Sequence, residues 1–381
     1  MVSTSGLFAR LMAMACVATG VVGCSQSPSA PASMSWDPQG AAAYLDRRMN
    51  SWMRWPATAL DHGTFCVSCH TAVPYALARP NLQMALGAAF PATAERQLVD
   101  NVRERVRLWS QTASDSDRGI DPRERAESRG TEAVLNALLL AWGDAHDVQL
   151  SADTRSAFDH LWAEQHVSGD DRGAWSWAGA ELEPWEGPDA EYYGAALAAL
   201  AVGVAPQNYR GLPQIQEHLQ LLRDYLTRDY PTQPLHHRLV LLWASTKLIG
   251  LLDVDRRQCV IEEALRAQNP DGGWSLSGLM SSSGKAGLLR DPDSDGYATG
   301  LATLVLEQTA LPERRVEVQR GLTWLMQNQR GHGGLWMHGR ERFWTATSLN
   351  KRRNPWRNVG RFMSDAATAY AVLALTEPAQ R

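Results

Sequence analysis

Cysteine is scarce in this chain, with 5 cysteines among 381 residues. So few cysteines in a chain of this length exclude the disulfide framework that holds small secreted domains together. Cys66 and Cys69 lie close together in the sequence, whereas Cys259 stands alone in an apolar helical pattern. We therefore expect Cys259 to be a buried small hydrophobic residue.

A strong charge bias is also absent, because the formal net charge is −4 and both signs are interspersed along the chain. Nucleic acid is therefore not an expected partner. Turn signals for β-hairpins and long alternating strand patterns are missing as well, which argues against a sheet protein. The chain is long enough to bury a sizeable core.

Near the N-terminus, residues 12–23 form an uncharged segment that is too short to span a membrane and is typical of a signal peptide. It ends in Val21-Val22-Gly23-Cys24, which resembles the lipobox of bacterial lipoproteins. The resemblance implies an acylated Cys24 and a lipid-anchored protein of the bacterial cell envelope that faces the periplasm. Residues 24–38 then form a flexible Ser/Pro/Ala-rich tether, and residues 39–381 a single domain.

One motif carries possible chemistry, namely Cys66-Val67-Ser68-Cys69-His70. In an exported chain, C-x-x-C-H indicates covalent attachment of haem c, with thioethers at both cysteines and His70 on the iron. Zinc and a local disulfide are the alternatives. On a helix, positions 66, 69 and 70 would share one face. Zinc would need a further ligand, for which the candidates are His236, His237 or a carboxylate.

A sixth iron ligand is difficult to assign, because no methionine occurs between Met84 and Met280. The nearest candidates are His62, Met53 and Met84.

Helical periodicity divides the remaining chain into two alternating classes. Amphipathic segments lie at 40–52, 93–110, 152–165, 212–228, 256–267 and 315–327. Small, apolar segments lie at 69–78, 131–142, 190–202, 235–251, 296–309 and 366–376. Amphipathic helices suit an outer layer and uniformly apolar ones must be buried. Six of each in alternation predict an all-α fold, an α6/α6 toroid.

Three places repeat a Gln, a Gly-containing turn and a Trp, and these are Gln165 to Trp175, Gln268 to Trp274 and Gln329 to Trp336. With these QW repeats, residues 130–376 resemble the terpenoid cyclase and protein prenyltransferase superfamily, and within it the squalene-hopene cyclases. The resemblance implies a structural role for the Gln and Trp side chains. It also implies an apolar or polyprenyl substrate and an acidic proton donor at the start of an inner helix.

The nearest match to the donor motif is Asp293-Ser294-Asp295, where Gly296 replaces the third acid of the family pattern. Asp365 begins a second inner segment. Either Asp295 or Asp365 is a candidate acid, and the alternative for both is a helix N-cap, where an aspartate is expected to have a lowered pKa.

Other candidate features surround the predicted cavity end. Trp175, Trp177 and Trp185 either line an apolar mouth or pack the rim. The basic, aromatic loop 340–361 could bind an anion or be merely solvated. Glu191 with Asp295 would suit a carbohydrate-active site. The two main predictions are a cyclase-like enzyme and a haem- or zinc-bearing redox or binding protein.

Overall fold

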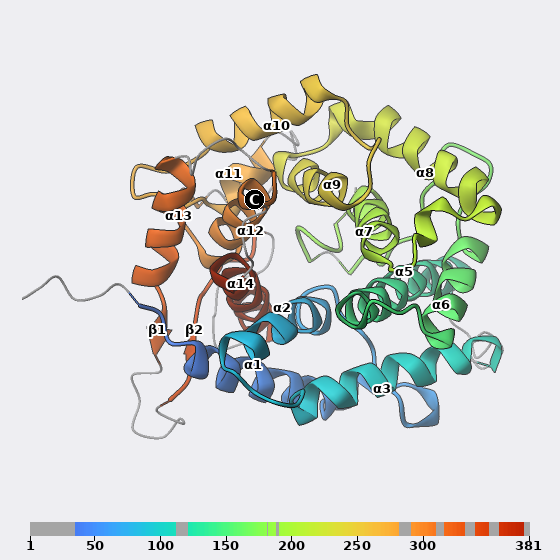
Figure 1. Ribbon diagram of the computed structural model, residues 1–381, viewed down its shortest axis with the longest axis horizontal. Helices are drawn as coiled ribbons and strands as arrows, with labels where there is room; N and C mark the ends of the chain where they lie inside the picture. Colours follow the sequence, from blue (N-terminus) through green and yellow to red (C-terminus); the bar gives the residue numbers. More distant parts are fainter. Residues whose placement is uncertain are drawn as a thin grey trace, which may run out of the picture. The chain divides into compact units, whose positions relative to one another are not determined.

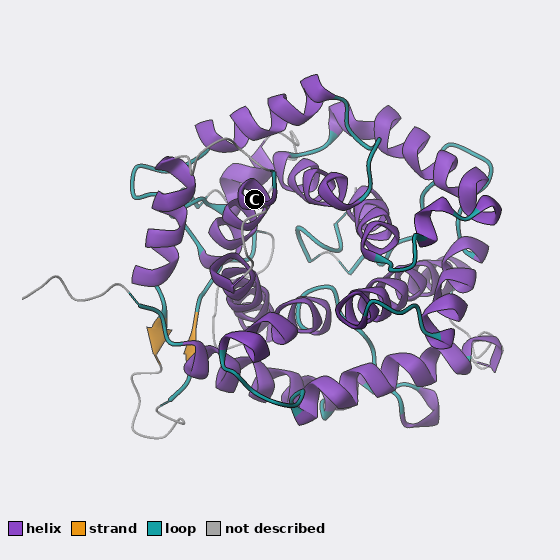
Figure 2. Ribbon diagram, viewed as in Figure 1, coloured by secondary structure: helices purple, strands orange, loops and turns teal. Residues whose placement is uncertain are grey.

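The all-α class predicted from the sequence is confirmed in the computed structural model (Figure 2). The structure describes residues 35–111, 121–180, 182–187, 190–281, 291–309, 316–331, 340–349 and 358–376. The predicted signal peptide, Cys24 and nearly all of the predicted tether lie outside these residues.

Six helices form an inner ring in residues 35–381, and each is seen nearly end-on in Figure 1. They are α2 (Ala72–Ala85), α5 (Pro122–Asp147), α7 (Ala190–Val204), α9 (Leu235–Lys247), α12 (Gly296–Gln308) and α14 (Asn358–Thr376). Each contacts the next in this order, and α14 returns to α2. Almost every side chain of α7 and α12 is buried, as expected for helices that are apolar on all sides.

Six amphipathic helices surround this ring (Figure 1). They are α1 (Pro38–Met53), α3 (Thr93–Arg107), α6 (Ala152–Ala163), α8 (Gln216–Asp229), α10 (Val254–Arg266) and α13 (Val316–Gln327). The chain also forms a short helix, α11 (Leu276–Met280), and within the described residues a two-stranded sheet of β1 (Arg330–Gly331) and β2 (Arg342–Phe343).

The predicted alternation holds, but three inner helices begin at other residues than expected. α5 begins at Pro122 because Asp121 accepts a hydrogen bond from the Arg123 amide and Pro122 suits the first helical position. α14 begins at Asn358, ahead of the predicted start at 366. α2 begins at Ala72, three residues after the predicted start at Cys69.

Each of the three repeats has an equivalent glutamine that forms a hydrogen bond with the next outer helix in the ring. In each case the side-chain amide donates to a carbonyl at the N-terminus of that helix. The pairs are Gln165 to His218 O at 3.1 Å, Gln268 to Glu317 O at 2.7 Å and Gln329 to Asp37 O at 3.0 Å. The third pair joins residues 292 positions apart and closes the ring, since Asp37 is the N-cap of α1.

The tryptophans of the repeats are equally regular. Each indole N–H donates to the carbonyl four residues before the glutamine of its repeat, and the pairs are Trp175 to Leu161 O, Trp274 to Ala264 O and Trp344 to Leu325 O. The third tryptophan is therefore Trp344 and not the predicted Trp336, which lies outside the described residues.

Within the described part of the chain, no helix combines the length and the apolar character that crossing a bilayer requires.

Candidate functional site

The Cys-x-x-Cys-His motif lies in the loop that leads into α2, not on the helix itself. The Ser68 hydroxyl accepts from the backbone amides of Thr71 at 3.2 Å and Ala72 at 3.1 Å, and so caps α2 from within the motif. Pro74 falls in the first turn, where its missing N–H costs nothing. The prediction that the two cysteines and His70 share one helical face is therefore wrong.

Neighbouring elements fix the backbone of this loop. The Asn101 side chain on α3 donates to Phe65 O at 3.0 Å and accepts from Phe65 N at 2.9 Å. The Trp52 indole on α1 donates to Cys66 O at 2.7 Å, and Cys66 N donates to Thr58 O at 2.8 Å. These hydrogen bonds fix the backbone where the chain enters the motif, at Phe65 and Cys66.

The hydrogen bonds around His70 decide which ring nitrogen carries the proton. The Thr71 hydroxyl donates to Asp365 Oδ2 at 2.8 Å, and His70 Nδ1 lies 3.0 Å from the same hydroxyl oxygen. Because the single hydroxyl proton is already directed at the carboxylate, Nδ1 must be the donor in the second bond. Nε2 therefore keeps its lone pair, and none of the residues described in the structure forms a hydrogen bond with it.

Asp365 organises this site and is not a helix cap, since it lies well inside α14. Its carboxylate accepts from Arg48 Nε at 2.7 Å, Arg48 Nη2 at 2.9 Å and Tyr44 OH at 3.0 Å, besides Thr71. The Asp365 side chain is 2% exposed and the Arg48 side chain 8%. Asp365 thereby connects α1, the Cys-x-x-Cys-His loop and α14.

Aromatic rings enclose His70, which is itself 4% exposed. Its ring stacks on Phe362 with a centroid distance of 4.1 Å and meets Trp52 edge-on at 5.1 Å. Burial, and secondarily the positive charge of Arg48, lower the pKa of His70 to about 3. The imidazole is therefore neutral at physiological pH, which is the form that binds metals.

Aromatic contacts of the His70 imidazole also connect it to the N-terminal ends of other inner helices. Its centroid lies 6.0 Å from that of Trp185, whose indole donates to Tyr297 OH at 2.9 Å. His236 Nε2 lies 2.8 Å from the same hydroxyl. The motif is thus at the end of the ring where α2, α9 and α12 begin.

The two thiols of the motif are both protonated at neutral pH. Solvent reaches the Cys66 side chain, yet protein surrounds it on most sides, and this burial with the nearby Glu132 raises its pKa to about 12. Cys69 is 1% exposed, and burial raises its pKa well above the usual value. Cys259, in contrast, is exposed and not buried as predicted, because Val260, Ile261 and Ala264 occupy the buried face of α10.

A zinc site is not assembled in the described part of the chain, where no three His, Cys, Asp or Glu side chains are placed to share one ion. Both histidines that were candidates for a further ligand are buried and engaged elsewhere. His236 bonds to Tyr297, and His237 lies 3.1 Å from Gln233 Oε1 and 3.2 Å from Pro184 O.

Two of the three candidates for a sixth iron ligand, Met84 and His62, are exposed. Met84 is 64% exposed and lies in the last turn of α2, about 18 Å along the helix axis from Ala72. Met53 ends α1, and His62 sits in an exposed turn.

Asp295 is the N-cap of α12, as the alternative interpretation predicted. Its Oδ1 accepts from the amides of Tyr297 at 3.0 Å and Ala298 at 2.9 Å, and its Oδ2 accepts from the Leu276 amide at 2.6 Å. Burial nevertheless raises the pKa of Asp295 to about 7, although these three donors act in the opposite direction. The lowered pKa expected for a cap is therefore wrong for Asp295.

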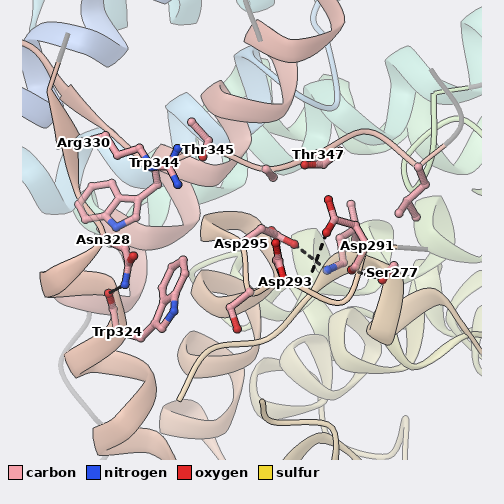
Figure 3. A pocket seen from close by; sticks show the side chains of 14 residues that line it. Ser277, Asp291, Asp293, Asp295, Trp324, Asn328, Arg330, Trp344, Thr345 and Thr347 are labelled. Carbon is pink, nitrogen blue, oxygen red and sulfur yellow. Dashed lines mark hydrogen bonds between the residues drawn. The ribbon is translucent and has the colours of Figure 1, made fainter. Parts of the chain in front are cut away.

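Asp293 and Asp295 border a pocket of about 190 Å³ between α11, α12 and α13 (Figure 3). Asp291, Asp293 and Asp295 lie on one side of it, and Arg330, Trp324 and Trp344 come from the opposite side. Asp365 does not line this pocket, so the three candidate acids belong to two separate sites.

The remaining candidates serve packing or lie outside the described residues. Trp175, Trp177 and Trp185 are at most 2% exposed, and their indoles all donate to protein oxygens, so they pack the rim and do not line an open mouth. Residues 350–357 of the basic loop fall outside the described residues.

No protein-family model matches this sequence, and a search of curated proteins found no match. The functional assignment therefore depends on the site itself. Sequence reasoning missed Arg48, Tyr44 and Thr71, and the only available signal was that Thr71 directly follows the motif.

Proposed function

We propose that this protein is a lipid-anchored protein of the bacterial cell envelope that carries haem c on Cys66 and Cys69, with His70 as the iron ligand. The observation that carries the proposal is the fixed tautomer of His70. Its Nδ1–H donates to the Thr71 hydroxyl, which in turn donates to Asp365, and its Nε2 lone pair is left without a partner among the described residues.

This arrangement is the one that a metal-binding histidine needs. Ligating histidines donate their other ring N–H to an acceptor, which orients the ring and raises its basicity. Here Thr71 is the acceptor and Asp365 polarises it from behind. Haem also suits the geometry better than zinc, because its thioether bonds to cysteine do not require Cys66, Cys69 and His70 to converge on one ion.

Bound haem would supply one-electron transfer or ligand binding at iron. The residues of the chain have three tasks around it. Thr71 and Asp365 orient the imidazole, Phe362 and Trp52 exclude water from its faces, and Arg48 neutralises the buried carboxylate.

Acid catalysis on an apolar or polyprenyl substrate has less support. The Asp365 carboxylate accepts hydrogen bonds from Arg48, Tyr44 and Thr71, and both oxygens of Asp295 accept from backbone amides. Neither carboxyl group is free to direct a proton at an alkene.

Production of the full chain with periplasmic c-type maturation tests the proposal. We expect a c-type pyridine haemochrome spectrum and haem that remains attached on a denaturing gel. Cys66→Ala and Cys69→Ala should each reduce covalent haem, whereas Cys259→Ser should retain it. Protein that matures without haem, or that binds zinc in equal molar amount, would refute the proposal.

The tautomer can be tested on protein without haem by ¹⁵N NMR of the histidine rings. His70 should show a protonated Nδ1 in the parent chain and in Thr71→Ser, which keeps the hydroxyl. Thr71→Val removes the acceptor, and the Nε2–H tautomer should then gain population. Identical spectra for the Val and Ser variants would contradict the role assigned to Thr71.

A further inference from the structure

The pocket between α11, α12 and α13 has no part in the site around His70, yet it carries charges of both signs (Figure 3). Asp291, Asp293 and Asp295 line one side of it, in the loop that leads into α12. Arg330 of β1 comes from the opposite side. Among the described residues that line the pocket, these four are the charged ones. A pocket of this kind suits a ligand that itself carries two opposite charges.

Two of these charges have no partner within the described part of the chain. The exposed Asp293 carboxylate and the exposed Arg330 guanidinium form no ion pair and no hydrogen bond with any described residue. Asp271 differs, although it lies directly behind the pocket. Its carboxylate accepts from the Gly273 amide at 3.0 Å, the Ser294 hydroxyl at 2.7 Å and the Trp324 indole at 3.0 Å. The acid behind the pocket is therefore satisfied, whereas the two charges that border it remain available to a ligand.

Uncharged polar groups add hydrogen-bonding capacity near Arg330. Thr345 and Thr347 line the pocket and follow β2, the strand that pairs with β1, and their hydroxyls have no partner among the described residues. Asn328 donates to Trp324 O at 2.9 Å and leaves its Oδ1 available. A guanidinium fork matches a phosphate geometrically, and hydroxyl donors can serve its further oxygens. This side of the pocket therefore suits a phosphate.

The opposite side suits a cation, and the protonation of Asp295 depends on it. Burial raises the pKa of Asp295 to about 7, and a cation in the pocket would favour the ionised form. The charged groups that face it are Asp291 and Asp293 from its own loop and Arg330 from β1. Tyr297 on α12 stays protonated, because burial raises its pKa well above the usual value. In the pocket lining, α11, α13 and the segment after β2 contribute only uncharged side chains.

We propose that this pocket binds a small zwitterion that carries a primary ammonium group and a phosphate. The ammonium group lies against the three aspartates and the phosphate against Arg330. An ammonium group has three N–H donors and no acceptor, so carboxylate oxygens are its natural partners. The pocket volume of about 190 Å³ limits the ligand to a small molecule or the headgroup of a larger one.

This chemistry has two sources, which are free glycerophosphoethanolamine and the headgroup of phosphatidylethanolamine. The membrane source is relevant because the described chain starts beside the pocket, where Trp36 lies 6.1 Å from Trp344 between ring centroids. Cys24 lies 11 residues before Ser35, which is at most about 40 Å of extended chain. The binding chemistry itself depends neither on the anchor nor on haem.

Calorimetric titration of the full chain with glycerophosphoethanolamine tests the proposal. We expect binding at one site, at least about tenfold tighter than that of ethanolamine or glycerol phosphate, because each of these lacks one of the two charged groups. The absence of binding would overturn the proposal. Equal affinity for ethanolamine would also overturn it, since the pocket would then recognise only a cation.

Two variants locate the binding in this pocket. Arg330→Gln and Asp293→Asn should each weaken binding by about tenfold and leave the thermal midpoint unchanged, since neither side chain has a partner among the described residues. Arg54→Gln and Asp147→Asn are the matched controls, because both side chains are exposed, lie outside the pocket and have no described partner. The proposal fails if the pocket variants bind the zwitterion as tightly as the controls.

The pH dependence of binding reports where the ammonium group lies. Binding should be several-fold tighter at pH 8 than at pH 6, because the ammonium group favours ionised Asp295 and neither charged group of the probe titrates in this range. Asp295→Asn keeps a residue that caps helices well and should remove most of the difference. Equal affinity of the parent chain at both pH values would contradict the placement of the ammonium group against the aspartates.

Vesicles distinguish the two sources of the zwitterion. Cys24→Ser removes the proposed anchor, so that vesicle binding reports on the pocket. If membrane lipid is the source, this variant should cosediment with vesicles of phosphatidylethanolamine and phosphatidylglycerol, and glycerophosphoethanolamine should compete. Replacing phosphatidylethanolamine by phosphatidylcholine, whose ammonium group has no N–H donor, should then abolish the binding. Absence of vesicle binding with the free zwitterion still bound supports the soluble source.

Discussion

Replacing Arg48 by methionine should destabilise the protein strongly, because it leaves the Asp365 carboxylate buried without a counter-charge. The two side chains are 8% and 2% exposed and share two hydrogen bonds of 2.7 and 2.9 Å. Breaking a buried pair by removing one partner costs about 3–5 kcal/mol. That is a large share of a typical stability of about 5–15 kcal/mol.

Urea unfolding followed by tryptophan fluorescence measures this loss. Arg123→Met is the matched control, since the Arg123 side chain is 85% exposed and its pair with Glu127 on α5 should be worth less than about 0.5 kcal/mol. The double variant Arg48→Met/Asp365→Leu removes the buried charge and should be more stable than Arg48→Met alone. If Arg48→Met were as stable as Arg123→Met, the assignment of Asp365 as a charge buried in the folded state would be wrong.

Three further predictions concern protons and glycines. The pKa of Asp295 rises from 3.8 to about 7 on folding, so ionisation of Asp295 destabilises the folded protein as pH increases between these values. The urea midpoint should therefore be lower at pH 8 than at pH 5, and Asp295→Asn should reduce this difference. In protein without haem at pH 8, iodoacetamide should modify Cys66, with its pKa of about 12, at least about a hundredfold more slowly than Cys259, as peptide mass spectrometry can measure. Gly173→Ala should lower the unfolding free energy in urea by about 2–5 kcal/mol, because φ is 99° and a Cβ would collide with Leu221 O. Gly63→Ala is the control, since Gly63 has φ of 71° but lies in open space, and it should cost about 1–2 kcal/mol. Equal losses for the two variants would contradict the packing assigned to Gly173.

The alternation of outer and inner helices was predictable because the buried face of a helix requires apolar residues at a regular spacing in the sequence. α7 and α12 are apolar all round and are buried, while α3 and α10 carry their charges on one face and lie outside. The cap role of Asp295 was also predictable, since it directly precedes a helical pattern. Helix starts were less predictable, although Pro74 already indicates a start near Ala72.

The site around His70 was only half predictable. The motif itself identified Cys66, Cys69 and His70, because their spacing is local in the sequence. Arg48 and Asp365 are 317 positions apart, and no periodic pattern marks two charges that meet only when the ring closes. The raised pKa of Asp295 was missed for a similar reason, because its burial depends on neighbours in space.

The long separation between the motif and α14 in the sequence makes the environment of His70 depend on ring closure. Phe362, which covers one face of His70, and Asp365, which reaches it through Thr71, both belong to α14, and Asp365 lies 294 positions after Thr71. Until that helix docks between α12 and α2, His70 lacks its stacking partner, and the Thr71 hydroxyl beside it lacks its carboxylate acceptor. The environment of His70 is therefore complete only when the ring has closed, so any change that loosens the docking of α14 should expose the imidazole while leaving the sequence of the motif intact.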